Sequence, residues 1–70
     1  MIINLKFGLN VYAFDVSKNE SVLSFKYKIS EKLNINIYSQ RLIYQGYPLL
    51  NDQLLNIKEN ETIYLILCLN

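Results

Sequence analysis

Few side chains in this sequence could do chemistry, and histidine is not among them. The 70 residues include one cysteine, Cys68, and no histidine. Imidazole metal sites, Ser-His and Cys-His nucleophiles and acid–base catalysis by histidine are therefore excluded. Cys68 lies in an apolar run with no charged neighbour that would activate its thiol. We expect no catalytic role for it.

Two groups of charged residues offer other chemistry. Glu59 and Glu61 could form an acid–base pair, but the polar stretch around them is typical of a solvated turn. A cluster of cations with an aromatic residue among them could grip single-stranded RNA: Lys18, Lys26, Lys28, Lys32 and Tyr27. Glu31 interrupts this cluster, and the net charge is only +1, whereas nucleic-acid surfaces are strongly basic. The sequence predicts no enzyme, no catalytic residue, no metal, no cofactor and no nucleic-acid partner.

Length and composition predict one small folded domain over residues 1–70. About half of the residues are hydrophobic (51%), enough for a single core. A lone cysteine permits no internal disulfide, which points to the cytosol or the nucleus. The longest apolar run, 63–69, is far short of the ~20 residues that a membrane helix needs. We expect a monomer with no membrane partner.

The first half of the chain predicts a β-hairpin followed by a helix. Apolar residues with polar ones interleaved form a strand at 2–7, Gly8–Asn10 supply a turn, and 11–16 form the second strand. Ser21 is a good N-cap for a helix that ends at 34–36. Its apolar residues lie within about 80° of arc, which makes one core-facing stripe: Val22, Phe25, Ile29 and Leu33.

Lys26 sits at the edge of that stripe, and two interpretations stay open. Its stem could lie along apolar surface with the ammonium in water. Alternatively, the ammonium is partly buried beside a carboxylate, with Asp52 as one candidate.

The second half of the chain predicts two or three more strands. The third strand is 41–45, and Leu49 and Leu50, after a turn at 46–48, could add a short strand or an extended segment. We expect the polar stretch 51–61 to be held to the core by three residues: Leu54, Leu55 and Ile57. The run 62–69 is apolar on both faces, which is typical of a central strand. The order predicts an α+β fold, a sheet of four to five strands with one helix on one face.

One helix leaves the second face of this sheet uncovered. In the last strand, one set of side chains packs on the helix: Ile63, Leu65, Leu67 and Leu69. The other set points away from it: Tyr64, Ile66 and Cys68. In the third strand Leu42 belongs to the core, which turns Ile43 outward. The pattern predicts an exposed apolar patch of Ile43, Tyr64 and Ile66, rimmed by Arg41 and Lys6. Such a patch indicates a partner surface or reflects strand propensity alone.

A resemblance bears on this choice. The segment QRLIYQGYPL at 40–49 closely resembles the QRLI-aromatic-x-G-x-x-L segment of ubiquitin and its relatives. The helix SVLSFKYKISEKLNI, its spacing to that segment and the final TIYLILCL are also similar to the family, in order along nearly the whole chain. The resemblance implies a ubiquitin-like β-grasp with a mixed sheet, and it favours the partner surface.

The resemblance also implies which residues bind. Ile43 matches the family's central patch residue, Ile66 its aliphatic residue on the last strand, and Tyr64 the position of ubiquitin's histidine. The full set of expected protein-binding residues is Ile43, Tyr64, Ile66, Arg41, Gly46, Lys6, Leu9 and Tyr47. Among them Leu9 matches the family's mobile leucine, in a turn one residue shorter here, and Tyr47 stands at the position of the main chain-linking lysine.

The departures from the family imply the kind of relative. The sequence ends Leu67-Cys68-Leu69-Asn70 without a diglycine tail, and the segment between Leu55 and Ile57 is about three residues shorter. We therefore expect an integral ubiquitin-like domain at the N-terminus of a larger protein, as in ubiquilin-type shuttle receptors and related chaperone cofactors.

The implied function is binding in protein quality control and degradation, in the cytoplasm or nucleus. The implied partners are ubiquitin-interacting helices, ubiquitin-associated domains and proteasome receptor subunits. The alternatives are a modifier precursor whose diglycine lies beyond Asn70 and a nucleic-acid-associated β-grasp domain.

Overall fold

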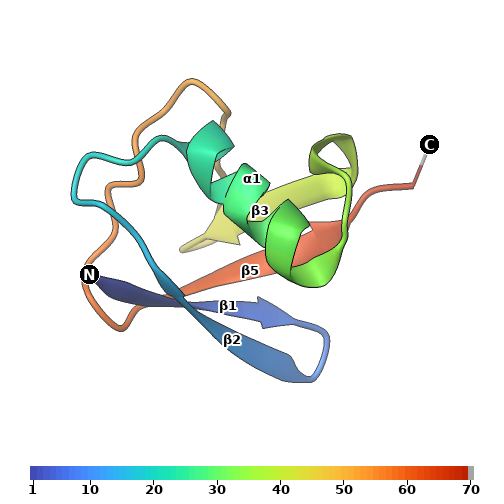
Figure 1. The fold of residues 1–70 in the computed structure, drawn as a ribbon, viewed down its shortest axis with the longest axis horizontal. Coiled ribbons are helices and arrows are strands. Elements are labelled where there is room, and N and C mark those ends of the chain that lie inside the picture. Colours follow the sequence, from blue (N-terminus) through green and yellow to red (C-terminus); the bar gives the residue numbers. More distant parts are fainter. Residues whose placement is uncertain (70) are drawn as a thin grey trace.

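A single helix crosses one face of a five-stranded sheet in the computed structural model, which describes residues 1–69 (Figure 1). The elements in chain order are β1 (Ile2–Phe7), β2 (Asn10–Asp15), α1 (Val22–Leu33), the short 3-10 helix η1 (Ile37–Ser39), β3 (Gln40–Tyr44), β4 (Tyr47–Pro48) and β5 (Thr62–Leu67). The strand order is β2-β1-β5-β3-β4, and β1 pairs with β5 in parallel while the other pairs are antiparallel. The predicted α+β β-grasp is confirmed, and β5 lies at the centre of the sheet as expected.

Tight turns set the register of both hairpins. In the β1–β2 hairpin Phe7 pairs with Asn10, and Gly8 takes a φ of 61° at the first of two loop positions. Because Asn10 already belongs to β2, the loop has two residues rather than the predicted three. In the β3–β4 hairpin Gln45 (φ 52°) and Gly46 (φ 83°) occupy the two central positions. Two successive positive φ angles are typical of the type I′ turn, whose twist matches that of the strands.

Capping defines the helix boundaries where the sequence predicted them. The Ser21 hydroxyl accepts a hydrogen bond from the Ser24 backbone N–H at 3.0 Å, which satisfies one of the free donors of the first turn. At the other end Asn34 adopts the left-handed conformation (φ 56°, ψ 42°), and its N–H donates to the Ser30 carbonyl. Asparagine tolerates this conformation better than most residues.

The core fills the space between α1 and the sheet. The Phe14 and Phe25 rings meet edge to face with centroids 5.2 Å apart, a preferred aromatic geometry. Twelve apolar residues are buried: Ile3, Leu5, Phe14, Val16, Val22, Phe25, Ile29, Leu42, Leu55, Ile57, Ile63 and Leu65. Leu33 is only partly buried, at the end of the stripe. No helix in the described residues is long and apolar enough to span a membrane.

Three details of the predicted fold are wrong. The turn after β3 is Gln45–Gly46 rather than 46–48, so the short fourth strand is Tyr47–Pro48 and not the strand offered as one alternative for Leu49 and Leu50. Leu54 is 59% exposed and anchors nothing. Leu67 and Leu69 are exposed although they alternate with the core set, because the core they would join ends with Leu65.

Candidate functional site: the uncovered sheet face

One row of side chains crosses all five strands on the face away from α1. The cross-strand pairs join Val11 to Lys6, Lys6 to Tyr64, Tyr64 to Ile43 and Ile43 to Pro48. Directly paired residues point to the same face of a sheet. Their neighbours along the strands, such as Leu42, point into the core. The structure therefore brings Lys6, Tyr64 and Ile43 together from β1, β5 and β3.

A second, shorter row lies beside the first. Arg41 of β3 pairs with Ile66 of β5, one step of the pleat away from the Ile43–Tyr64 pair. Tyr64 and Ile66 are half exposed, at 49% and 51%, whereas Ile43 is partly buried between its neighbours. We call Ile43, Tyr64 and Ile66 the sheet-face patch. It is apolar at its centre and flanked by two cations.

The remaining predicted residues lie in the two hairpins. Gly46 lies in the β3–β4 turn. Tyr47 is exposed, but it pairs with Tyr44 rather than with Ile43, so the register places it on the face opposite the patch. Leu9 belongs to the β1–β2 turn and is almost fully exposed, at 98%. This turn lies at the sheet end where Ile66 follows Tyr64, because β1 and β5 run parallel. The β3–β4 turn lies at the other end of the sheet, because β3 runs antiparallel to β5.

The charges beside the patch are not neutralised within the described chain. The ion pairs found in residues 1–69 join the N-terminal ammonium to Asp15 and Lys28 to Glu20, so Lys6 and Arg41 have no carboxylate partner there. The surface around the patch therefore favours an acidic partner.

Lys26 matches neither sequence interpretation in full. Its side chain is buried (8% exposed), and no ion pair within the described residues joins it to Asp52, which is exposed. Burial lowers the pKa of the Lys26 ammonium, and the nearby Arg41 guanidinium lowers it further. The Lys26 backbone has a structural role, since its carbonyl accepts a hydrogen bond from the Gln40 amide at 3.0 Å.

Glu20 is a buried carboxylate that the sequence pattern did not single out. It accepts hydrogen bonds from the Ser17 N–H, the Ser24 hydroxyl and the Lys28 ammonium at 2.9, 3.0 and 2.8 Å. Burial alone would raise the pKa of Glu20, but these three donors together hold that pKa below its ordinary value. The spacing of Ser24 and Lys28, four and eight residues after Glu20, is the signal that could have revealed it.

Glu61 is tied into the structure and is not free for acid–base work with Glu59. It accepts hydrogen bonds from the Tyr44 hydroxyl and the Lys58 backbone N–H. These donors lower the pKa of the Glu61 carboxyl, and the same bond raises the pKa of the Tyr44 hydroxyl. Cys68 is a partly buried free thiol whose backbone N–H donates to the Ser39 carbonyl at 2.7 Å.

Comparisons with known proteins agree with this fold. The family model described as "Ubiquitin family" matches residues 3–69. No curated protein matches closely enough to count as a relative. Among 400 matching chains of solved structures is the crystal structure of ATBAG1 in complex with HSP70, at 18% identity and a TM-score of 0.92. The alignment covers 97% of this chain and 40% of that chain. The chain belongs to the ubiquitin family.

Proposed function

We propose that this chain is a non-enzymatic protein-interaction module that binds ubiquitin receptors through the sheet-face patch. Its partners would be ubiquitin-interacting helices, ubiquitin-associated domains or proteasome receptor subunits, and its role would lie in protein quality control. One observation carries the proposal. The cross-strand pairing of Ile43 with Tyr64, and of Arg41 with Ile66, gathers an apolar surface on the face that α1 leaves open. Membership of the ubiquitin family supports the same conclusion.

The size of the patch sets the expected affinity. Three apolar side chains contribute roughly 4–9 kcal/mol if fully buried by a partner. Ile43 is already partly buried in the free chain, so the true value falls toward the lower end. Association costs at least about 4 kcal/mol, so contacts outside the patch must contribute. We expect dissociation constants in the weak micromolar range, about −8 kcal/mol or less negative.

The flanking cations set the kind of partner. Lys6 is the cross-strand neighbour of Tyr64, and Arg41 is that of Ile66. A partner helix with an apolar stripe and acidic residues on either side would therefore complement the patch and its two cations. Charges at the rim of an interface act mainly on association rate and selectivity. We expect binding to weaken as salt is raised.

The larger protein and the cell compartment are further parts of the proposal. The ATBAG1 chain that this fold resembles is longer, with 40% of it covered, and it was solved in complex with HSP70. That complex supports protein partners in general. We propose that this chain acts as one domain of a larger cytoplasmic or nuclear protein, in a quality-control setting.

A two-dimensional amide NMR titration tests the proposed function. A peptide with an amphipathic ubiquitin-interacting helix should shift the amides of β3 and β5 around Ile43, Tyr64 and Ile66. Ile43→Ala should weaken binding about tenfold or more, which corresponds to the loss of about 1.4 kcal/mol. Single-stranded RNA at physiological salt should cause no shifts. Shifts with RNA and none with the helix would refute the proposal in favour of a nucleic-acid-binding domain.

A further inference from the structure

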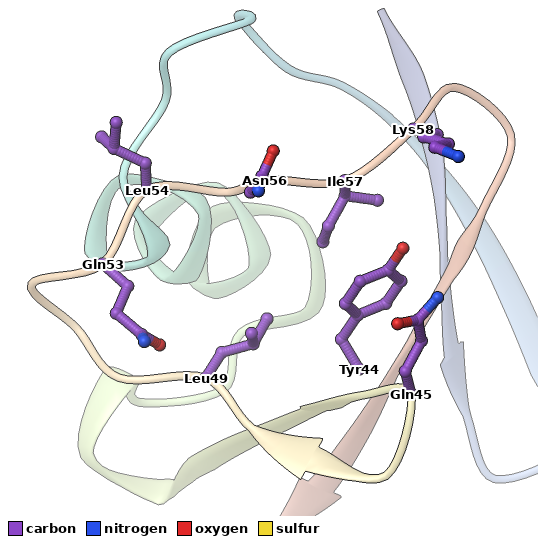
Figure 2. A pocket seen from close by; sticks show the side chains of 8 residues that line it. All are labelled: Tyr44, Gln45, Leu49, Gln53, Leu54, Asn56, Ile57 and Lys58. Carbon is purple, nitrogen blue, oxygen red and sulfur yellow. The ribbon is translucent and has the colours of Figure 1, made fainter.

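A second candidate site lies away from the sheet-face patch. A cavity of about 500 Å³ opens between the β3–β4 hairpin and the loop that joins β4 to β5 (Figure 2). Figure 2 shows the Tyr44 ring and the Leu49 and Ile57 side chains directed toward its centre. This volume falls in the range of small-ligand pockets, about 300–1,000 Å³.

The cavity exists because the loop passes over the hairpin without filling the space beneath it. Only Asn56 separates the buried Leu55 and Ile57, and its side chain is exposed. The Leu49 and Ile57 side chains point into the gap from this connection but do not fill it. The walls of the cavity come from β3 on one side and from residues 49–58 on the other.

Hydrogen bonds hold the loop in place. Leu50 N–H donates to the Gln53 amide oxygen at 2.8 Å and Gln53 N–H to the Leu50 carbonyl at 3.0 Å, which closes a turn. Val22 N–H, in the first turn of α1, donates to the Gln53 carbonyl at 2.8 Å, and Leu55 N–H donates to the Glu20 carbonyl at 2.7 Å. The loop is thus fixed to the start of the helix. A ligand would enter a cavity that is already formed, at little cost in ordering.

The lining selects for a ligand that is apolar at one end and rich in acceptors at the other. Leu49, Ile57 and the Tyr44 ring supply the apolar part, and Leu54 extends it onto the surface, where it is exposed. The polar part consists of side-chain amides and the Lys58 ammonium. No carboxylate lines the cavity, so its one formal charge is positive.

The Lys58 ammonium has no ion-pair partner within the described residues. The Glu61 carboxylate lies outside the lining, where it accepts hydrogen bonds from the Tyr44 hydroxyl and the Lys58 backbone N–H and interacts with the Lys58 charge at longer range. Because Gln53 uses its amide oxygen for the Leu50 N–H, its amide nitrogen is left to donate. Charge and donors together favour a carboxylate-bearing ligand.

We propose that this cavity binds an acidic peptide segment of a protein partner. A branched aliphatic side chain would lie against Leu49 and Ile57, an adjacent Asp or Glu would pair with Lys58, and the amides would bond the peptide backbone. The exposed Leu54 favours a peptide over a small molecule, because it extends the apolar surface beyond the cavity. This site is independent of the proposed function, since it shares no residue with the sheet-face patch.

The test uses two matched peptides and amide NMR. Acetyl-Glu-Leu-Glu-amide should shift amides at 44–45 and 49–58 and bind about three- to fivefold more tightly than acetyl-Gln-Leu-Gln-amide, the effect of one exposed ion pair. Lys58→Gln should abolish that preference. Lys18→Gln, which removes an exposed lysine elsewhere, should preserve it. Leu54→Ser should weaken both peptides equally.

Several results would overturn the assignment. Equal affinity for the two peptides would show that Lys58 does not select an acidic ligand. An absence of amide shifts at millimolar peptide would show that the cavity does not bind the peptide. Shifts centred on Tyr64 and Ile66 that vanish with Ile43→Ala would place the peptide on the sheet-face patch instead. Tighter binding of 4-methylpentanoate would assign the cavity to a small carboxylic acid. Because Ile43→Ala leaves the cavity intact, failure here and failure of the proposed function are separate outcomes.

Discussion

Replacing Leu42 and Ile43 by alanine, one at a time, tests the direction of every side chain in β3. The two residues are adjacent in sequence, similar in size and on opposite faces of the sheet. Leu42 is buried in the core, at 1% exposure. Leu42→Ala should therefore cost about 2–5 kcal/mol of unfolding free energy, from lost burial and the cavity left behind. A chain of 70 residues has a total stability of about 3.5–10 kcal/mol, so this loss is a large fraction.

Ile43→Ala should lower the free energy of unfolding much less than Leu42→Ala does, and it should weaken partner binding much more. Ile43 is only partly buried, so the stability loss should stay near the spread of strand propensity, about 1 kcal/mol. Its burial by a partner contributes up to about 1.5–3 kcal/mol, which corresponds to a loss of affinity of about tenfold or more.

Urea unfolding followed by circular dichroism, together with the NMR titration, separates the two effects. With a slope of about 1 kcal/mol per molar urea, Leu42→Ala should lower the midpoint by about 2 M or more. Ile43→Ala should lower it by about 1 M or less. If Ile43→Ala unfolds the domain and Leu42→Ala is tolerated, the assignment of the two faces of β3 is wrong, and with it the sheet-face patch.

Three further predictions follow from other features. Glu20→Gln should lower stability by about 1–3 kcal/mol at pH 7, because it removes a charged acceptor from three donors. Because the pKa of Glu20 is lower in the folded state, the stability that its carboxylate contributes is present above about pH 4.5 and is lost as the pH falls through the folded pKa. The difference in urea midpoint between Glu20→Gln and the unmodified protein should therefore be smaller at pH 3 than at pH 7. An equal difference at both pH values would refute this. Gly46→Ala should cost about 1–2 kcal/mol by the same assay, since φ is 83° with open space around the new methyl group, and a neutral result would contradict the type I′ turn. The affinity of this chain for the ubiquitin-interacting helix peptide should change less than about twofold between pH 5.5 and 8, because histidine is absent and Tyr64 stands at the ubiquitin histidine position. A plot of affinity against pH with a midpoint in that range would disprove it.

The sequence predicted those parts of the fold that depend on local chemistry. Ser21 and Asn34 bound the helix because capping depends on a single residue and its immediate neighbours. The two-residue alternation of β5 put Tyr64 and Ile66 on one face, and pairing with β3 then brought Ile43 to the same face. The alternation within each strand needed no knowledge of distant segments, whereas the position of Ile43 beside Tyr64 depends on the pairing of β3 with β5.

The errors fall where distant parts of the chain decide burial. Leu54 looks like a core anchor in sequence, but the neighbouring Leu55 and Ile57 occupy the core and leave it outside. Leu67 is at a position of β5 that alternates with the core residues Ile63 and Leu65, but no other side chains of the described residues cover it there, and it is exposed. Lys26 is buried without the carboxylate that one of its two interpretations offered, and Glu20 is buried with a lysine that lies two helical turns away. No local pattern specifies such partners.

The parallel pairing of β1 with β5 has a consequence for how this protein is made. Within this domain a ribosome releases β1 well before β5, yet these two strands lie side by side in the sheet. The amino-terminal hairpin and the helix can form early, but their shared apolar surface waits for the final strand. We therefore expect this domain to remain incompletely folded until β5 has left the exit tunnel. Contacts between such distant segments also slow folding.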